Sequence, residues 1–162
     1  VIEVASGPII ASHSNAKKLA NVKRNLSDEQ LIAIAETGGL VGINACSSFV
    51  SSHVEKQTIE GLIDQIDYIK NLIGIEHISF GFDFCDYLPW SYVGLPNPAT
   101  NSVTVEGLSS EADIPKLIDR MRERGYTQNE IELIAYKNYE RLLEKIFNKG
   151  YQYTLQYGSQ QL

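Results

Sequence analysis

Short apolar runs alternate with longer amphipathic segments along most of the chain. Three apolar runs have the length and the β-branched character of strands: residues 8–12, 40–45 and 77–82. Apolar residues at three- and four-residue steps predict four helices: residues 27–37, 58–73, 110–124 and 127–150. The order strand, helix, strand, helix, strand, helix, helix predicts a parallel sheet with right-handed crossovers.

Capping sequences and glycines set the predicted helix boundaries. Ser27 is followed three residues later by Gln30, and Thr127 by Glu130, and both pairs have the spacing of a capping box. Gly74 ends the most strongly amphipathic helix.

Polar loops follow all three predicted strands. They cover residues 13–26, 46–56 and 87–109, and the last is rich in proline and glycine and is predicted to be a lid over the strand ends. The segment before the first strand is expected to be the last turn of a helix. The polar and aromatic tail from Tyr151 has no predicted place.

Composition narrows the class of protein. The chain has 162 residues, of which 43% are hydrophobic and 21% charged, as in one ordinary globular domain. No apolar run is long enough to span a bilayer, and a net charge of −6 without a basic stripe gives no support to a nucleic-acid partner. Arg120, Arg122 and Arg124 share their predicted helix with acidic residues, so a solvated face is expected there.

Two cysteines, Cys46 and Cys85, bear on the compartment. Each follows an apolar strand, where buried thiols are common, and no Cys-x-x-Cys spacing is present. We expect both thiols to be reduced and the protein to be cytoplasmic.

Three strand ends bring polar residues to one edge of the predicted sheet. His13, Asn44 and Asp83 each follow a strand, which is where parallel α/β enzymes place their chemistry. His13 is either a metal ligand or a capped loop histidine, and Arg24 is either a clamp for a substrate carboxylate or a surface charge. Asp83 lies in an aromatic run, where a carboxylate is costly unless it serves a site.

Other motifs are weaker or missing. His53 and His77 are expected to be ordinary surface residues. No glycine-rich dinucleotide fingerprint follows a strand, and no Gly-x-Ser-x-Gly elbow is present.

An ordered series of motifs resembles one enzyme family. The series is Ile10-Ala11-Ser12-His13-Ser14-Asn15-Ala16, then Lys23-Arg24-Asn25-Leu26-Ser27-Asp28-Glu29-Gln30, then Gly81-Phe82-Asp83-Phe84. Near the end come Arg124-Gly125-Tyr126-Thr127 and Asn138-Tyr139-Glu140-Arg141-Leu142-Leu143. Together they are similar to the renal (membrane) dipeptidase family of zinc peptidases, over nearly the whole chain to about residue 148.

The resemblance implies a fold and a reaction. The fold is a (β/α)8 TIM barrel of the metal-dependent hydrolase type, in which two zinc ions share a bridging carboxylate and a bridging hydroxide that attacks a dipeptide. It implies that His13 ligates one zinc and that Arg24 grips the substrate's C-terminal carboxylate. Asp83 would contact the substrate's amino group or move a proton, and Phe49 would line the pocket. An assembly of several copies is compatible with it.

The chain also departs from the family pattern. The usual Asp-Phe-Asp-Gly reads Asp83-Phe84-Cys85-Asp86, and the family's His-x-Asp pair, bridging Glu and second zinc-binding His are not in the sequence. One histidine cannot hold two zinc ions. Because the chain begins at Val1 without methionine, we expect it to be the C-terminal part of a longer protein.

These expectations define the predicted organisation. Residues 1–150 would hold the last three β/α units and the C-terminal helices of the barrel, residues 151–162 would form a tail, and the chain alone would be inactive. Two alternatives stay open: a related barrel hydrolase acting on a cyclic amide or a lactone, and a non-catalytic binding or assembly relative.

Overall fold

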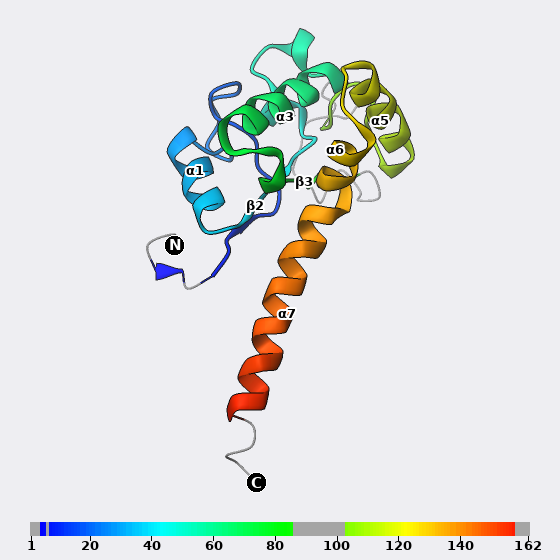
Figure 1. Cartoon of the computed structure of the whole chain (residues 1–162). Coiled ribbons are helices and arrows are strands. Elements are labelled where there is room, and N and C mark those ends of the chain that lie inside the picture. Colours follow the sequence, from blue (N-terminus) through cyan, green and yellow to red (C-terminus); the bar gives the residue numbers. More distant parts are fainter. Residues whose placement is uncertain (1–3, 6, 86–102, 158–162) are drawn as a thin grey trace.

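A computed structural model of the chain describes residues 4–5, 7–85 and 103–157. Three short strands alternate with helices in the predicted order (Figure 1). The strands are β1 (Ile10–Ala11), β2 (Leu40–Ile43) and β3 (Ile78–Phe80). The α-helices are α1 (Asp28–Glu36), α2 (Ser47–Val50), α3 (Ile59–Ile73), α5 (Ile114–Glu123), α6 (Gln128–Glu132) and α7 (Asn138–Tyr157). Short 3-10 turns are η2 (Val54–Lys56), η3 (Ile75–His77) and η4 (Glu111–Asp113), and η5 (Leu133–Lys137) is a π-helical turn.

The sheet is parallel and has the order β1-β2-β3. Ile10 lies opposite Leu40, and Gly42 lies opposite Ser79, so both neighbouring pairs run the same way. Every residue of β2 is buried, as the continuous apolar run predicted for a central strand covered on both faces. The predicted strands are confirmed, although each is shorter than the apolar run that predicted it.

Helices α1 and α3 pack against each other and against β2. Ser27 and Gln30 form the predicted capping box at the start of α1. Helix α3 begins after Thr58 and ends at Gly74, as predicted, and its buried stripe of leucine and isoleucine forms much of the core. None of the helices in the described part of the chain combines the length and apolar character needed to cross a membrane.

Charged side chains join α5 to α3. Arg124 Nη2 lies 2.8 Å from Asp64 Oδ1 and 2.6 Å from Asp67 Oδ2, and Arg120 Nε lies 2.6 Å from an oxygen of Glu60. Arg120 and Arg124 remain exposed, so the predicted solvated face is confirmed, and acidic residues of α3 lie opposite both of them.

A second ion pair fixes the start of α6. Lys70 Nζ lies 2.6 Å from Glu130 Oε1, and Glu130 also accepts hydrogen bonds from the backbone and side chain of Thr127. These contacts, with the lysine first, lower the pKa of Glu130 to about 2. Burial, together with a hydrogen bond to Asp67, raises the pKa of neighbouring Tyr126.

Two expectations about loops and ends need correction, and two stay untested. The segment 46–56 is not a simple loop, because it contains α2 and η2. The last helix does not stop near Gly150, since α7 continues to Tyr157 and extends away from the rest of the molecule (Figure 1). Most of the predicted lid and of the predicted N-terminal helix end lies outside the described residues.

Candidate functional site

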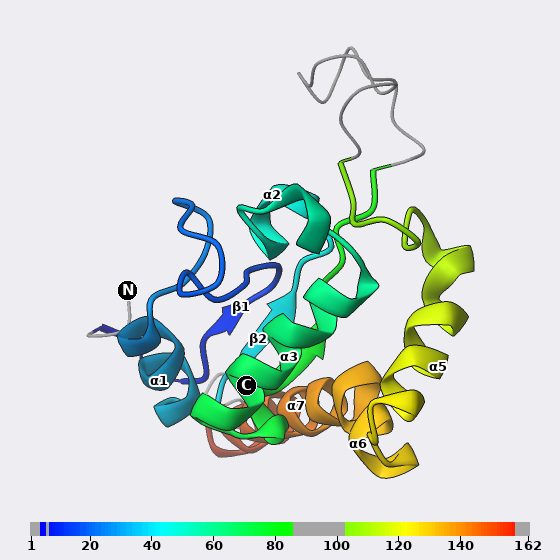
Figure 2. The same cartoon turned by 90° about the horizontal axis from the view of Figure 1, so that it is seen from above.

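The carboxyl ends of the three strands meet at one edge, which we call the rim. The loop of residues 13–26 and helix α2 lie at this edge, to which the strand arrows point in Figure 2. Pairing with β2 extends past β1, because the backbone of Ser14 donates to the carbonyl oxygen of Gly42 at 2.7 Å. The first polar loop of the chain therefore begins directly at the strand ends.

Two glycines allow the chain after β1 to lie close to its neighbours. A Cβ atom at Gly42 would come within 2.1 Å of the Ser12 carbonyl oxygen, and one at Gly81 within 2.0 Å of the same oxygen. No real side chain tolerates that distance from a backbone atom. The position of Ser12, and with it that of His13, therefore depends on the absence of side chains at both positions.

His13 lies between a hydroxyl and a guanidinium group. Its Nδ1 lies 2.7 Å from the Ser12 hydroxyl oxygen, and its Nε2 lies 2.5 Å from Arg24 Nη2. A guanidinium can only donate, so Nε2 must present a lone pair, and the contacts assign the ring proton to Nδ1. This tautomer leaves Nε2 as the nitrogen that would bind a cation.

The Phe49 ring completes this group. Arg24 Cζ lies 5.9 Å from the centroid of the ring, within the range of a cation–π contact. Helix α2 carries Phe49, whereas the loop after β1 carries the other two residues. The structure thus brings together three of the four residues to which the family resemblance assigns a role: His13, Arg24 and Phe49.

Asp83 stands apart from this group. It is exposed, its φ is +61°, and its carboxylate makes no hydrogen bond or ion pair to any other residue that the structure describes. The left-handed conformation is uncommon for a side-chain-bearing residue and is often retained where a site needs it. The rings of its sequence neighbours Phe82 and Phe84 are tilted with centroids 5.2 Å apart, and Phe82 also stacks on Phe80 at 4.7 Å.

Asn44 differs from expectation. The sequence placed its side chain among those presented at the rim, but the residue is fully buried. Its Oδ1 instead accepts a hydrogen bond from the backbone of Cys46 at 2.6 Å, which turns the chain from β2 toward α2. We therefore assign Asn44 to the shape of the rim and not to its exposed chemistry.

Three buried carboxamides were missed by sequence reasoning. Asn15, Asn25 and Gln65 are at most 3% exposed, and all three donate to the carbonyl oxygen of Phe49. One signal was available, because Gln65 is a polar residue within the apolar stripe of α3, between Leu62 and Ile66. A buried amide in such a stripe needs partners, and here the partners are at the rim.

The sequence profile of the membrane dipeptidase family, peptidase family M19, matches residues 1–154. The chain belongs to this family.

Two relatives and a solved structure illustrate the membership. The chain is 30% identical over 148 residues to an uncharacterized protein in the pqqA 5′ region of Klebsiella pneumoniae, covering 90% of this chain and 49% of the relative. It is 31% identical over 153 residues to an uncharacterized dipeptidase of Schizosaccharomyces pombe, covering 93% and 34%. It superposes with a TM-score of 0.73 on a metallopeptidase from Rhodobacter sphaeroides bound to a phosphinate mimic of the dipeptide L-Ala-D-Ala, at 26% identity, covering 88% and 37%.

Both of these relatives are longer than this chain. It spans about half the length of the first relative and about a third of the second. The mixed α/β fold with a parallel sheet agrees with the solved family structures.

A metal centre needs more ligands than the described residues supply. Among them, no group of three histidine, cysteine, aspartate or glutamate side chains lies close enough to hold a metal ion. His13 offers one nitrogen, and Arg24 already contacts it. The described residues therefore do not fit a membrane dipeptidase metal centre by themselves.

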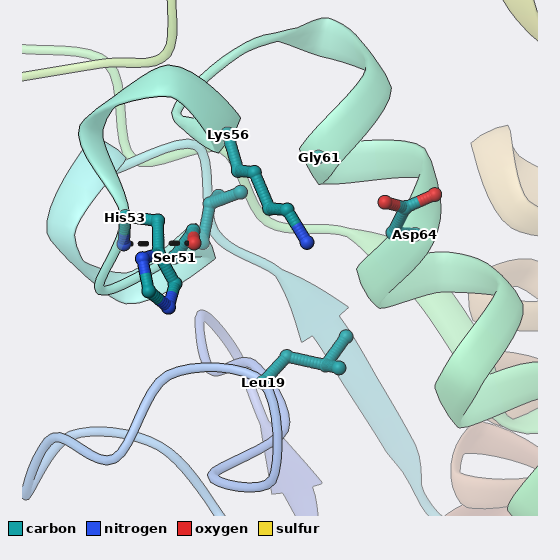
Figure 3. A pocket seen from close by; sticks show the side chains of 7 residues that line it. Leu19, Ser51, His53, Lys56, Gly61 and Asp64 are labelled. Atoms are coloured by element: carbon teal, nitrogen blue, oxygen red, sulfur yellow. Dashed lines mark hydrogen bonds between the residues drawn. The ribbon is translucent and has the colours of Figure 1, made fainter.

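A hollow between the loop of residues 13–26, the segment from α2 to η2 and the start of α3 is separate from the group of His13, Arg24 and Phe49. It has a volume of about 90 Å3, and none of His13, Arg24 or Phe49 lines it. Figure 3 shows the side chains of Lys56 and Asp64 on one side and that of Leu19 on another. Its full lining is Leu19, Val50, Ser51, His53, Lys56, Gly61 and Asp64.

The two remaining histidines differ from each other. The side chain of His53 is 70% exposed, so the prediction that His53 is a surface residue is confirmed. His77 is half-buried, and its Nδ1 lies 2.9 Å from the carbonyl oxygen of Gly39. The expectation for His77 is wrong, because the residue ties η3 to the connection between α1 and β2.

Proposed function

We propose that this chain forms the substrate-binding side of a zinc-dependent dipeptidase. One observation carries the proposal: Arg24, Phe49 and His13 are gathered at the carboxyl edge of a parallel sheet in a chain of the membrane dipeptidase family. That edge is where enzymes built on parallel strands place their reacting groups.

Arg24 is the residue for the substrate's carboxylate. A guanidinium presents a planar set of donors that matches a carboxylate with two parallel hydrogen bonds. The Phe49 ring on one side of Arg24 restricts the directions in which the guanidinium can turn. The side chain of Arg24 makes no ion pair within the described residues, so its positive charge remains available to a ligand.

Asp83 is assigned to the opposite end of the dipeptide. Its exposed carboxylate can attract a protonated amino group or accept a proton from it. His13 is assigned as one zinc ligand through Nε2, and further ligands would come from residues beyond the described part. When bound, zinc would supply a water of lowered pKa at neutral pH.

The sheet edges support completion by further β/α units. Among the described residues, β1 and β3 each pair only with β2, so each has one open edge. Beside β3 and α7 lies a groove of about 560 Å3 whose apolar lining includes Phe80, Tyr139, Leu143 and Phe147. Phe147 is 69% exposed, which is unusual for so large an apolar side chain. We infer that further units of a (β/α)8 barrel cover this groove.

The experiment compares the complete protein with this chain. We expect the complete protein to bind two zinc ions and to release amino acids from dipeptides in a zinc-dependent way. We expect residues 1–162 alone to be inactive. A dipeptide with an amidated C-terminus is the control substrate, because it lacks the carboxylate that Arg24 binds. Absence of zinc, or equal rates on both substrates, would contradict the proposal.

A further inference from the structure

We propose that Asn15, Asn25 and Gln65 are positioning residues for the substrate's carboxylate. They set the place of Phe49 and Arg24 by converging on one backbone oxygen. The link to substrate rests on the function proposed for Arg24, whereas the positioning itself is a property of this chain alone.

The point of convergence is the carbonyl oxygen of Phe49. Asn25 Nδ2 donates to it at 2.8 Å, Asn15 Nδ2 at 3.2 Å and Gln65 Nε2 at 3.4 Å. A carbonyl oxygen has two lone pairs, so three donors leave it little freedom to move. The ring attached to that backbone is the one that lies beside the Arg24 guanidinium.

Each amide nitrogen uses its second hydrogen elsewhere. Asn15 donates to Asn44, Asn25 to Ala20 and Gln65 to Val50, each time to a backbone carbonyl at 2.8 or 2.9 Å. The network therefore joins the rim loop to the residue that follows β2, to α2 and to α3.

The amide oxygens are also occupied. Asn15 accepts from the backbone of Asn44 at 2.9 Å, Gln65 from Ala16 at 2.9 Å, and Asn25 from Asn15 at 3.3 Å. No donor or acceptor of the three side chains is left without a partner. A buried polar network that is fully satisfied favours one arrangement over its alternatives.

The network also fixes the two ends of the loop that carries the site. Asn25 directly follows Arg24, and Asn15 comes two residues after His13. One set of hydrogen bonds therefore controls all three members of the group at the rim. Loss of a donor is expected to free Phe49 and Arg24 together, and a displacement of about 1 Å in a binding group can cost on the order of a hundredfold in rate.

Another buried asparagine provides a matched control. Asn138 is 1% exposed, and its Nδ2 donates to the carbonyls of Ile75 and Ile78 at 2.8 and 2.9 Å, where β3 begins. It resembles Gln65 in burial and in its two amide-to-carbonyl bonds, but it lies at the opposite end of the strands. Its loss tests for general destabilisation without touching the rim.

The first test compares Gln65→Met with Asn138→Leu by NMR of the 162-residue chain. Nuclear Overhauser contacts between the Phe49 ring and the Arg24 side chain report their apposition directly. We expect these contacts to be lost in Gln65→Met and kept in Asn138→Leu. Contacts that persist in Gln65→Met would overturn the proposal, as would equal loss in both variants.

Hydrogen exchange of the unmodified chain gives a readout that needs no variant. The side-chain amide protons of Asn15, Asn25 and Gln65 should exchange more slowly than those of exposed Gln128. Equal exchange would overturn the proposal even if Gln65→Met failed to fold.

The second test uses kcat/KM of the complete protein for a free dipeptide divided by that for its C-terminal amide. We expect Gln65→Met to lower this ratio about tenfold, mainly through KM, and Asn138→Leu to leave it unchanged. A variant that only unfolds part of the protein population lowers both kcat/KM values by the same factor, so their ratio stays constant. If the complete protein hydrolyses no dipeptide while the NMR contacts behave as expected, the proposed function fails and the positioning role stands.

Discussion

Arg24 Nη2 lies 2.5 Å from Nε2 of His13, so the guanidinium covers the ring nitrogen that is best placed to bind a metal. In this arrangement Arg24, the residue proposed to bind the substrate's carboxylate, contacts His13, the residue proposed to bind zinc. His13 would use Nε2 to hold zinc, and Arg24 would then be free to meet a carboxylate.

This contact predicts the reactivity of His13. Because the guanidinium covers the Nε2 lone pair, Arg24→Ala should increase the rate at which diethyl pyrocarbonate modifies His13, measured by peptide mass spectrometry. His53 is exposed in either protein and serves as the internal control. An unchanged rate at His13 would show that the contact does not persist in solution.

Arg24→Ala should also separate binding from chemistry in the complete protein. The clamp acts alike on ground state and transition state, so KM should rise on the order of tenfold to a hundredfold while kcat falls less. Lys18→Ala, which removes an exposed charge from the same loop, is the control. An unchanged KM would remove Arg24 from the site.

Gly81→Ala should destabilise the fold and displace His13. The new methyl group would meet the Ser12 carbonyl oxygen, and overpacking of this kind costs about 1–3 kcal/mol. For a chain of this size that corresponds to a fall in Tm of roughly 2–4 °C per kcal/mol, measured by circular dichroism. Gly7→Ala has open space around the added carbon and should leave Tm unchanged.

The ion pair of Glu130 predicts a loss of stability in acid. Its folded-state pKa of about 2 lies below the ordinary glutamate value of 4.5, so its contribution to stability is complete above about pH 4.5 and is lost as the pH falls toward 2. Glu130→Gln should therefore lower the urea midpoint at pH 6 and have little effect near pH 2. Glu111→Gln, an exposed carboxylate without a described partner, should show no such pH-dependent difference.

The sequence predicts correctly those parts of the fold that depend on residues close together in the chain. The Ser27–Gln30 and Thr127–Glu130 pairs fix helix starts through hydrogen bonds within four residues, and both are present. The sequence predicts too early an end for α7, because Gly150 lies within the helix, which continues to Tyr157. Helix α2 was missed because four residues are too few to show a period.

The sequence predicts which residues belong to the candidate site, but it does not predict which buried residues hold them in place. His13 and Arg24 were found because the polar loop that follows β1 carries them. The roles of Gln65 and His77 depend on partners 16 and 38 residues away, at Phe49 and Gly39, and no local pattern encodes such pairs. The same is true of Asn44, whose position after a strand gave no sign that its side chain turns inward.

The three amides around the Phe49 carbonyl have an electrostatic consequence. Carboxamides do not ionise, so they hold Arg24 in place without offering it a competing negative charge. A scaffold of aspartate and glutamate in the same positions would partly neutralise the guanidinium and would weaken in acid. The neutral scaffold leaves the full positive charge for the ligand, and its hydrogen bonds should keep the same strength across the physiological pH range.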